Sequence, residues 1–228
     1  MVSLFPEHIE TNQWRHCLHL IDKGSVITIT SKIHGTSQRL SYIPVPVKLN
    51  FFQKIINKLF FKNTEHYDYT YIQGTRRTIK YEGTKVENGY YGTDIFRDKI
   101  SDKIKPAMNK NEIVYFEIVG YTDTGSLIMG SVDTTKLKDK EFTKRFGQTM
   151  HYKYGCLSGE CEAYVYRIAV VNLDGIVEEM SWDRVKRRCR EMGIKHVPEM
   201  DSFVFDGDID NLKKHVDYLT DGVDIADP

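Results

Sequence analysis

The stretch VITITSKIHGTS, residues 26–37, alternates between apolar and polar residues and then gives way to a small, polar turn. The period of two predicts a strand over residues 26–32, with Ile27 and Ile29 facing the core. Thr28, Thr30 and Lys32 then share the other face, where they could line a pocket. A lysine at the end of a strand is usually a solvated charge, but its place before this turn also suits a nucleophile.

Further strands and helices follow along the chain. The apolar stripe of Phe96, Ile100 and Ile104 predicts a helix that Pro106 stops, and Ser181 and Gly193 are typical of the two ends of another. The pattern predicts strands at 39–43, 67–81 (broken by a turn), 113–121 and 163–171, and helices at 94–105, 136–146, 183–192 and 208–219. We therefore expect an α+β fold of antiparallel sheets flanked by helices.

Residues 44–66 are predicted to be a helical insertion between two strands. They begin with Pro44-Val45-Pro46, and the amphipathic stretch at 47–62 follows. Its lysines fall mostly to one side of a helix and its aromatic residues to the other. Such a helix either packs its apolar face on the domain or contacts a nucleic acid or a membrane surface. The lysines are Lys48, Lys54, Lys58 and Lys62.

Composition limits the partners. The 228 residues include 32 Lys and Arg and 32 Asp and Glu, so the net charge is zero and announces no nucleic-acid partner. Residues 184–195 are locally basic, which still suits phosphate binding. There is no long apolar run and no signal-peptide pattern, so we expect a reduced, cytoplasmic protein with no membrane partner. Cys156-x4-Cys161 offers half of a zinc site with no second pair, which favours two unpartnered thiols.

The segment Lys32-Ile33-His34-Gly35 has the form K-x-x-G and resembles motif I of the covalent nucleotidyltransferases. This superfamily contains the ATP-dependent ligases and the mRNA capping enzymes. The continuation His34-Gly35-Thr36-Ser37 is similar to the RNA ligases of the bacteriophage T4 RNA ligase 2 type. DNA ligases usually carry Asp at the position of His34.

Three further segments resemble motifs of the family and occur in the family's order. Thr75-Arg76-Arg77-Thr78 resembles motif Ia and implies that Arg77 lies near the nucleotide. Residues 115–120 (YFEIVG) resemble motif III, whose glutamate matches Glu117 and contacts the ribose. Residues 163–168 (AYVYRI) resemble motif IIIa, in which an aromatic residue, here Tyr166, stacks on adenine. Two departures are Phe116, where the family often has Gly, and Arg167, where an acid often follows the aromatic residue.

The resemblance implies the fold, the reaction and the cofactors. It implies the nucleotidyltransferase fold, the ATP-grasp-like adenylation fold of ligases, with ATP and Mg²⁺ as cofactors and RNA ends as partners. Lys32 would become lysyl-AMP, and AMP would pass to an RNA 5′-phosphate that is then joined to a 3′-hydroxyl. His34 would assist a later transfer, and Arg76, Lys54 and Lys58 are expected to contact RNA. The nucleotide-binding residues are expected to be Ser31, Gly35, Thr36, Ser37, Arg77, Glu117 and Tyr166.

Chemistry explains why these residue types suit the reaction. A free lysine has a pKa of about 10.4 and is mostly protonated at neutral pH. Partial burial, a nearby cation such as Arg77, or a metal would favour the neutral amine. Gly35 lets the backbone approach the phosphates, and Thr36 and Ser37 offer hydroxyls near the ribose.

The pattern is incomplete at the C-terminal side. No convincing motif IV acid or motif V K-x-K strand is found, and Asp174-Gly175-Ile176-Val177 is interpreted as a hairpin turn, so no metal ligand is identified. We expect residues 1–228 to form an adenylation domain without recognisable motifs IV and V, either an N-terminal part of a longer ligase or a decayed homologue. The alternatives are a DNA ligase, a GTP-dependent capping-type enzyme, or a catalytically incomplete module that binds nucleotides or RNA ends. The oligomeric state and the kind of RNA are not predicted.

Overall fold

The computed structural model describes residues 4–6, 8–9, 11–60, 66–81, 90–137 and 140–220. Its strands are β1 (Val26–Thr30), β2 (Thr36–Pro46), β3 (Tyr67–Gly74), β4 (Ile79–Tyr81), β5 (Glu112–Gly120), β6 (Val132–Asp133), β7 (Thr149–Met150), β8 (Cys161–Val171), β9 (Val177–Glu179), β10 (Lys195–His196) and β11 (Glu199–Val204). Its helices are α1 (Phe51–Phe60), α2 (Ile95–Ile104), α3 (Lys140–Phe146), α4 (Trp182–Met192) and α5 (Ile209–Thr220), with short 3₁₀ turns η1 (Trp14–His16), η2 (Leu18–Leu20), η3 (Lys105–Ala107) and η4 (Thr134–Leu137).

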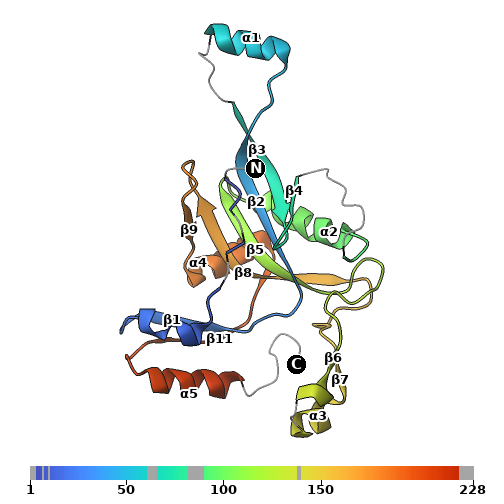
Figure 1. The fold of residues 1–228 in the computed structure, drawn as a ribbon, viewed down its shortest axis with the longest axis vertical. Helices are drawn as coiled ribbons and strands as arrows, with labels where there is room; N and C mark the ends of the chain where they lie inside the picture. The colour runs from blue at the N-terminus through green and yellow to red at the C-terminus, as the bar shows by residue number, and fades with distance from the viewer. Residues whose placement is uncertain are drawn as a thin grey trace.

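A seven-stranded sheet forms the centre of the molecule (Figure 1). Its strand order is β10-β8-β5-β2-β3-β4, and β9 pairs with β8. Its pairs are antiparallel except for the parallel pair of β10 and β8. The expected α+β architecture of antiparallel sheets flanked by helices is therefore confirmed.

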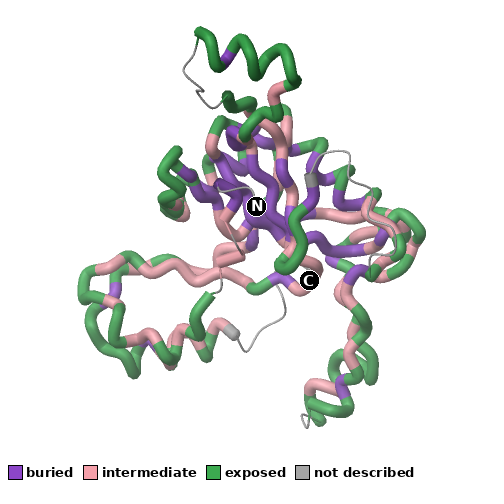
Figure 2. Tube along the Cα trace, turned by 45° about the horizontal axis from the view of Figure 1, so that its top comes forward, coloured by how far each residue is buried: buried purple, intermediate pink, exposed green. Residues whose placement is uncertain are grey.

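The two faces of this sheet are covered differently. Helices α2 and α4 pack on one face, where the predicted stripe of Phe96, Ile100 and Ile104 is fully buried. On the other face, the N-terminal residues Leu4 and Phe5 join a second cluster. Figure 2 shows that burial is concentrated in this central sheet.

Several expected ends of elements are confirmed. Pro106 lies in η3 directly after α2, and Gly193 ends α4 in the left-handed conformation, with φ 64°. Ser181 occupies the N-cap position of α4, although its side chain makes no capping hydrogen bond. The helix predicted at 136–146 is shorter, because α3 begins at Lys140 and residues 138–139 lie outside the described part.

The strand that opens the sequence pattern is not part of the central sheet. β1 pairs with β11 in a separate two-stranded ribbon, in which Ile27 lies opposite Phe203. Ile27 and Ile29 are only partly buried, so the prediction that they face the core is wrong. The alternation identified the strand correctly, but it carried no information about which strand would become its partner.

The predicted insertion is a helix, but it begins later than expected. β2 continues through Pro44 and Pro46 and stays paired with β3, so the insertion starts after Pro46. β5 pairs with β2 only as far as Tyr42, so beyond that residue β2 is an edge strand, where proline is tolerated. Lys62 lies outside the described residues.

Helix α1 lies at the far end of the β2–β3 hairpin, away from the rest of the molecule (Figure 1). The first of the two interpretations, that its apolar face packs on the domain, is wrong, because its aromatic and aliphatic side chains are exposed. No helix among the described residues is long and apolar enough to cross a membrane.

Candidate functional site

The turn around Lys32 connects the ribbon to the central sheet. Ile33 is buried against Val119, Tyr154 and other residues, and Ser31 N–H donates to the carbonyl of Pro198 at 2.9 Å. While Ile33 is fixed inside, Lys32 is exposed and His34 is half-buried. Partial burial was one of the three factors expected to favour the neutral amine of Lys32. Because Lys32 is exposed, the structure does not provide it.

Gly35 stands where no other residue fits. A Cβ atom at this position would lie 2.2 Å from the carbonyl oxygen of Ile118, a backbone atom of β5. The turn therefore enters β2 in direct contact with β5. The Gly35 N–H donates a hydrogen bond to the Glu117 carboxylate, which joins the turn after Lys32 to β5.

Three adjacent strands bring the predicted nucleotide-binding side chains together. Ser37 on β2 lies opposite Glu117 on β5, and Glu117 lies opposite Tyr164 on β8. The register of β5 and β8 shifts between Tyr115 and Phe116, where β8 has one extra residue, Tyr166. The hydroxyl groups of Ser37 and Tyr166 lie 3.1 Å apart. Ser37, Glu117 and Tyr166 thus form one group, and the β-bulge helps to aim Tyr166.

This group lies on the sheet face opposite to α2 and α4. Phe116 and Ile118 join the core cluster beneath those helices, so the intervening Glu117 projects to the other side. Tyr166 is only partly buried, and its ring lies beside that of Tyr115, with 6.4 Å between the ring centroids. An aromatic ring with an accessible edge or face beside a carboxylate is suited to hold a planar base and its sugar.

Glu117 is the titratable group of the site with the largest shift. Burial raises its pKa from 4.5 to about 7, although the Gly35 N–H, Arg97 and Lys32 all act in the opposite direction. The carboxyl group is therefore partly protonated near neutral pH. Lys32 lies close enough for its charge to favour the ionised form of Glu117.

Arg97 of α2 is a site residue that the sequence reasoning missed. Its guanidinium donates to Thr36 Oγ1 at 2.6 Å and to the Ser37 carbonyl at 3.4 Å, and it forms an ion pair with Asp94 at 3.5 Å. Desolvation lowers its pKa. Arg97 therefore fixes the first residues of β2 from beneath. Its signal in the sequence was a charged residue beside the buried stripe of α2, with Ser101 one turn later.

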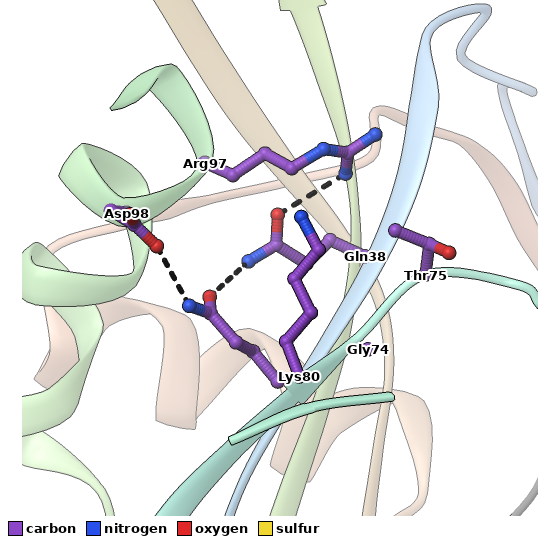
Figure 3. Close-up of a pocket in the computed structure, with 7 residues that line it drawn as sticks. Gln38, Gly74, Thr75, Lys80, Arg97 and Asp98 are labelled. Carbon is purple, nitrogen blue, oxygen red and sulfur yellow. Dashed lines mark hydrogen bonds between the residues drawn. The ribbon is translucent and has the colours of Figure 1, made fainter. Parts of the chain in front are cut away.

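A polar network continues from Arg97 below the sheet (Figure 3). Arg97 donates to Gln38 Oε1 at 3.3 Å, and Gln38 donates to Gln73 at 2.9 Å. Gln73 donates in turn to Asp98 at 2.7 Å, which leads back to α2. These residues line a small cavity between the sheet and α2. Their side chains are hydrogen-bonded to one another across it, from the sheet on one side and from α2 on the other.

His34 is held by two tyrosines that the sequence reasoning also missed. Its backbone N–H donates to the Tyr154 hydroxyl at 2.8 Å, and its ring lies 4.9 Å from the ring of Tyr152. Tyr154 is buried and has the left-handed φ of 51°, uncommon for a residue with a side chain. This conformation supports the turn after Lys32.

The basic residues expected at the site are more distant from its centre. Arg76 and Arg77 are exposed in the turn between β3 and β4, beyond Gly74, which pairs with Arg39 near the Thr36 end of β2. Lys54 and Lys58 lie on α1, at the opposite end of β2. A strand rises about 3.3 Å per residue, so the ten steps from Thr36 to Pro46 span about 33 Å.

Arg167, which follows Tyr166 on β8, has a structural role. Its Nε lies 3.0 Å from Glu179 Oε2, and its Nη1 donates to the carbonyl of Ile9 at 3.2 Å. The residue therefore connects β8 to β9 and to the N-terminal segment. The interpretation of Asp174 and Gly175 as a hairpin turn is confirmed, because they lie between the antiparallel β8 and β9.

Comparisons with known proteins give ligases, all at low similarity. An RNA ligase mutant from Naegleria gruberi with ATP and Mn is 14% identical, with a TM-score of 0.46 over 88% of this chain and 45% of that chain. An apo mutant of Naegleria gruberi RNA ligase is 12% identical, with a TM-score of 0.47 over 90% of this chain and 45% of that chain. A protein from Aquifex aeolicus assigned as an ATP-dependent DNA ligase is 12% identical, with a TM-score of 0.42 over 91% of this chain and 40% of that chain.

The chain spans less than half the length of each of these three solved chains. No protein-family model and no curated protein matches the sequence.

Proposed function

We propose that this chain is the adenylation region of an ATP-dependent RNA ligase, with a nucleotidyltransferase fold and Lys32 as the residue that accepts AMP. The observation that carries the proposal is the placement of the Lys32–Gly35 turn beside the row formed by Ser37, Glu117 and Tyr166. These residues come from three separate segments of the sequence. The first of them, Lys32, and the last, Tyr166, are 134 positions apart. Their convergence on one face of the central sheet is the arrangement that we expect nucleotide transfer to a lysine to need.

The proposed first step is a nucleotidyl transfer. Lys32 Nζ forms a bond to the α-phosphorus of ATP, the bond from that phosphorus to the bridging oxygen breaks, and pyrophosphate leaves. The ammonium proton must depart before the attack, and it passes to solvent or to the leaving group. Exposure of Lys32 leaves room for a triphosphate to approach it.

The neighbouring residues would orient the nucleotide. Glu117 lies next to the Gly35 N–H and is proposed to accept a hydrogen bond from the ribose, while the Tyr166 ring is proposed to stack on adenine. Such stacking is worth about 1–3 kcal/mol for a base on an aromatic side chain. Arg97 holds Thr36 and Ser37 in place and so acts as a positioning residue.

The described residues do not form a complete site for a metal ion. No group of three or more His, Cys, Asp or Glu side chains in the described ranges could hold one. Mg²⁺ is often bound by one or two carboxylates together with the phosphates of its substrate. Mg²⁺ would therefore come bound to the phosphates of ATP, and the experiment supplies the two together.

The RNA substrate is proposed from the sequence pattern around His34. In this proposal AMP passes from Lys32 to an RNA 5′-phosphate, and a 3′-hydroxyl then displaces it, with His34 assisting one of the transfers. Arg76 and Arg77, exposed at the same end of β2, are proposed to contact the nucleic acid or the nucleotide phosphates.

Mass spectrometry of the chain after incubation with ATP and Mg²⁺ tests the proposal. We expect an AMP adduct on the peptide that contains Lys32, and we expect Lys32→Ala to abolish it while Lys23→Ala, at another exposed lysine, retains it. An adduct that survives in Lys32→Ala would contradict the assignment. GTP in place of ATP, and DNA ends in place of RNA ends, separate the capping-type and DNA ligase alternatives.

Nucleotide binding gives a second readout that does not require catalysis. We expect Tyr166→Ala to weaken ATP binding by about tenfold or more, as the loss of one stacked base predicts. Tyr218→Ala, at an exposed tyrosine on α5, serves as the matched control. ATP binding without any adduct would favour a nucleotide-binding module over an enzyme.

A further inference from the structure

Helix α1 begins at a reciprocal pair of hydrogen bonds. Gln53 N–H donates to Asn50 Oδ1 at 2.8 Å, and Asn50 N–H donates to Gln53 Oε1 at 2.9 Å. This capping box satisfies two N–H groups at the helix start. One turn later, Asn57 is buried, and its Oδ1 lies 3.1 Å from His66 Nε2, just before β3. The helix is therefore joined to its hairpin through its polar side.

The apolar side of α1 points away from the protein. Its exposed fractions run from 41% for Ile55 to 75% for Phe52. A helix turns about 100° per residue, so the apolar side chains fill an arc of about 180°, and Asn57 lies on the opposite arc. A surface helix normally buries its apolar stripe against its own domain. In α1 the apolar side chains are exposed and Asn57 is the buried residue. Figure 2 shows the helix as exposed along almost its whole length. The apolar residues are Phe51, Phe52, Ile55, Ile56, Leu59 and Phe60.

The charge around this apolar arc has one sign. Lys54 and Lys58 lie beyond one edge of the arc, and Lys48 precedes the helix; all three are exposed. Residues 47–60 contain no Asp or Glu, and Asp68 on β3 is the nearest acid among the described residues that follow. Lysine stems can lie along an apolar surface while their ammonium groups reach outward. An apolar arc with positive charge beside it complements a partner that has an apolar layer beneath a negatively charged surface.

The dimensions of α1 argue against a second copy of the chain as its partner. Ten residues make a helix about 15 Å long and about 10 Å wide. A stable interface takes about 20–30 residues from each partner, whereas α1 has ten residues. Pairing α1 with itself would also bring lysines of like charge together.

The composition of the arc argues against RNA. Single-stranded nucleic acids bind where bases stack on aromatic rings inside a positively charged groove. The arc has Phe52 near its centre, but the residues beside it, Ile55, Ile56 and Leu59, are aliphatic and offer no stacking surface, and the arc is convex. Lysine pairs can contact phosphates, but the exposed apolar surface would then remain in water.

We propose that α1 is a peripheral membrane-binding element that recognises the anionic phospholipid surface of a bilayer. The helix lies in the plane of the interface, with its apolar arc at the acyl boundary and Lys48, Lys54 and Lys58 at the lipid phosphates. At about 15 Å it is far too short to cross a hydrocarbon core of about 30 Å. Tyr67, half exposed at the base of the helix, suits the headgroup level. The Lys32 turn, about 33 Å away along β2, stays on the water side.

Vesicle co-sedimentation of the full chain tests this proposal. We expect binding to vesicles of phosphatidylcholine with phosphatidylserine and little binding to phosphatidylcholine alone. Phe52→Ser with Leu59→Ser should reduce the bound fraction at least tenfold, because the apolar arc is lost. Lys54→Gln with Lys58→Gln should weaken binding about 30-fold, since each lysine near an anionic surface contributes about fivefold, the factor that corresponds to about 1 kcal/mol.

A matched control variant replaces two exposed apolar side chains on another part of the surface. Leu173→Ser with Ile176→Ser changes the β8–β9 hairpin, and we expect vesicle binding equal to the wild type. Circular dichroism and thermal unfolding establish that each variant is folded. Loss of binding in this control, or no binding of the wild type to anionic vesicles, would overturn the proposal.

Two further results would replace the membrane with another partner. A concentration-dependent dimer without lipid, abolished by Phe52→Ser with Leu59→Ser, would indicate a second copy. The other result is RNA binding, measured as a mobility shift, that is lost with Lys54→Gln and Lys58→Gln but kept with Phe52→Ser and Leu59→Ser. If the protein also failed to bind vesicles, this would indicate a nucleic-acid contact. Neither result depends on the adduct at Lys32, so this proposal and the proposed ligase activity can fail separately.

Discussion

The two ends of strand β2 differ in how the chain holds them. At the Thr36 end, the backbone of Gly35 touches β5, Arg97 binds from below, and Ser37 meets Tyr166. At the Pro46 end, β2 pairs only with β3 and leads to a helix whose apolar side faces water. One strand thus connects a turn held by several elements to a helix whose apolar side chains are exposed.

The two ends of β2 therefore differ in local stability. Contacts at the Thr36 end are buried and come from several elements, so that end can open only when the sheet opens. Contacts at α1 are few and polar, so that end can change without disturbing the core. Positioning of a reactive lysine needs the first kind of support, whereas docking on a surface needs the second.

The largest effect is expected from Gly35→Ala. The new Cβ would meet the backbone oxygen of Ile118 at 2.2 Å, and neither strand can move without breaking its pairing. We expect a loss of about 3 kcal/mol in the free energy of unfolding, measured by chemical denaturation. The matched control is Gly130→Ala, where no atom lies within 4 Å of the added Cβ, and we expect a change below about 1 kcal/mol. Equal losses in the two variants would show that the close approach to β5 is not important.

A smaller, pH-dependent effect is expected from Glu117→Gln. Burial raises the pKa of Glu117 in the folded state from 4.5 to about 7, so between these pH values the folded state binds more protons than the unfolded state. The free energy of unfolding of the wild type should therefore fall as pH rises through this window. Glutamine has no proton to lose, so the variant should gain on the wild type by on the order of 1 kcal/mol by pH 8.

Thermal unfolding between pH 4.5 and 8 measures this difference. Glu178→Gln, at an exposed position on β9, should keep a constant offset from the wild type across the same range. A constant offset for Glu117→Gln as well would mean that burial does not perturb this carboxyl group.

The smallest effect is expected at the other end of β2. Phe52→Ser with Leu59→Ser removes side chains that are already in water, so the global free energy of unfolding should change by less than about 0.5 kcal/mol. Leu40→Ala, at a fully buried position in the same strand β2, should lose about 2–5 kcal/mol. A large loss in the α1 variant would show that its apolar face packs on the domain after all.

The sequence predicted most helices and strands because an element with one buried face repeats its apolar residues at a fixed period. The stripe of α2, the run of β5 and the N-cap and C-cap positions of α4 were recognised in this way. Arg97 was missed, since a helical pattern shows that a residue flanks the buried stripe but not what polar group lies opposite. Tyr154 was missed because its role depends on a left-handed turn more than a hundred residues after His34.

By itself, the sequence determined the α+β class and the helix between β2 and β3, because local periodicity is enough for each. Only the tertiary structure decided that β1 pairs outside the central sheet, that Glu117 meets the Gly35 N–H, and that α1 turns its polar side inward. These outcomes depend on which distant segments become neighbours. A pattern along the chain fixes which face of an element is apolar, but the packing of the whole molecule decides what that face meets.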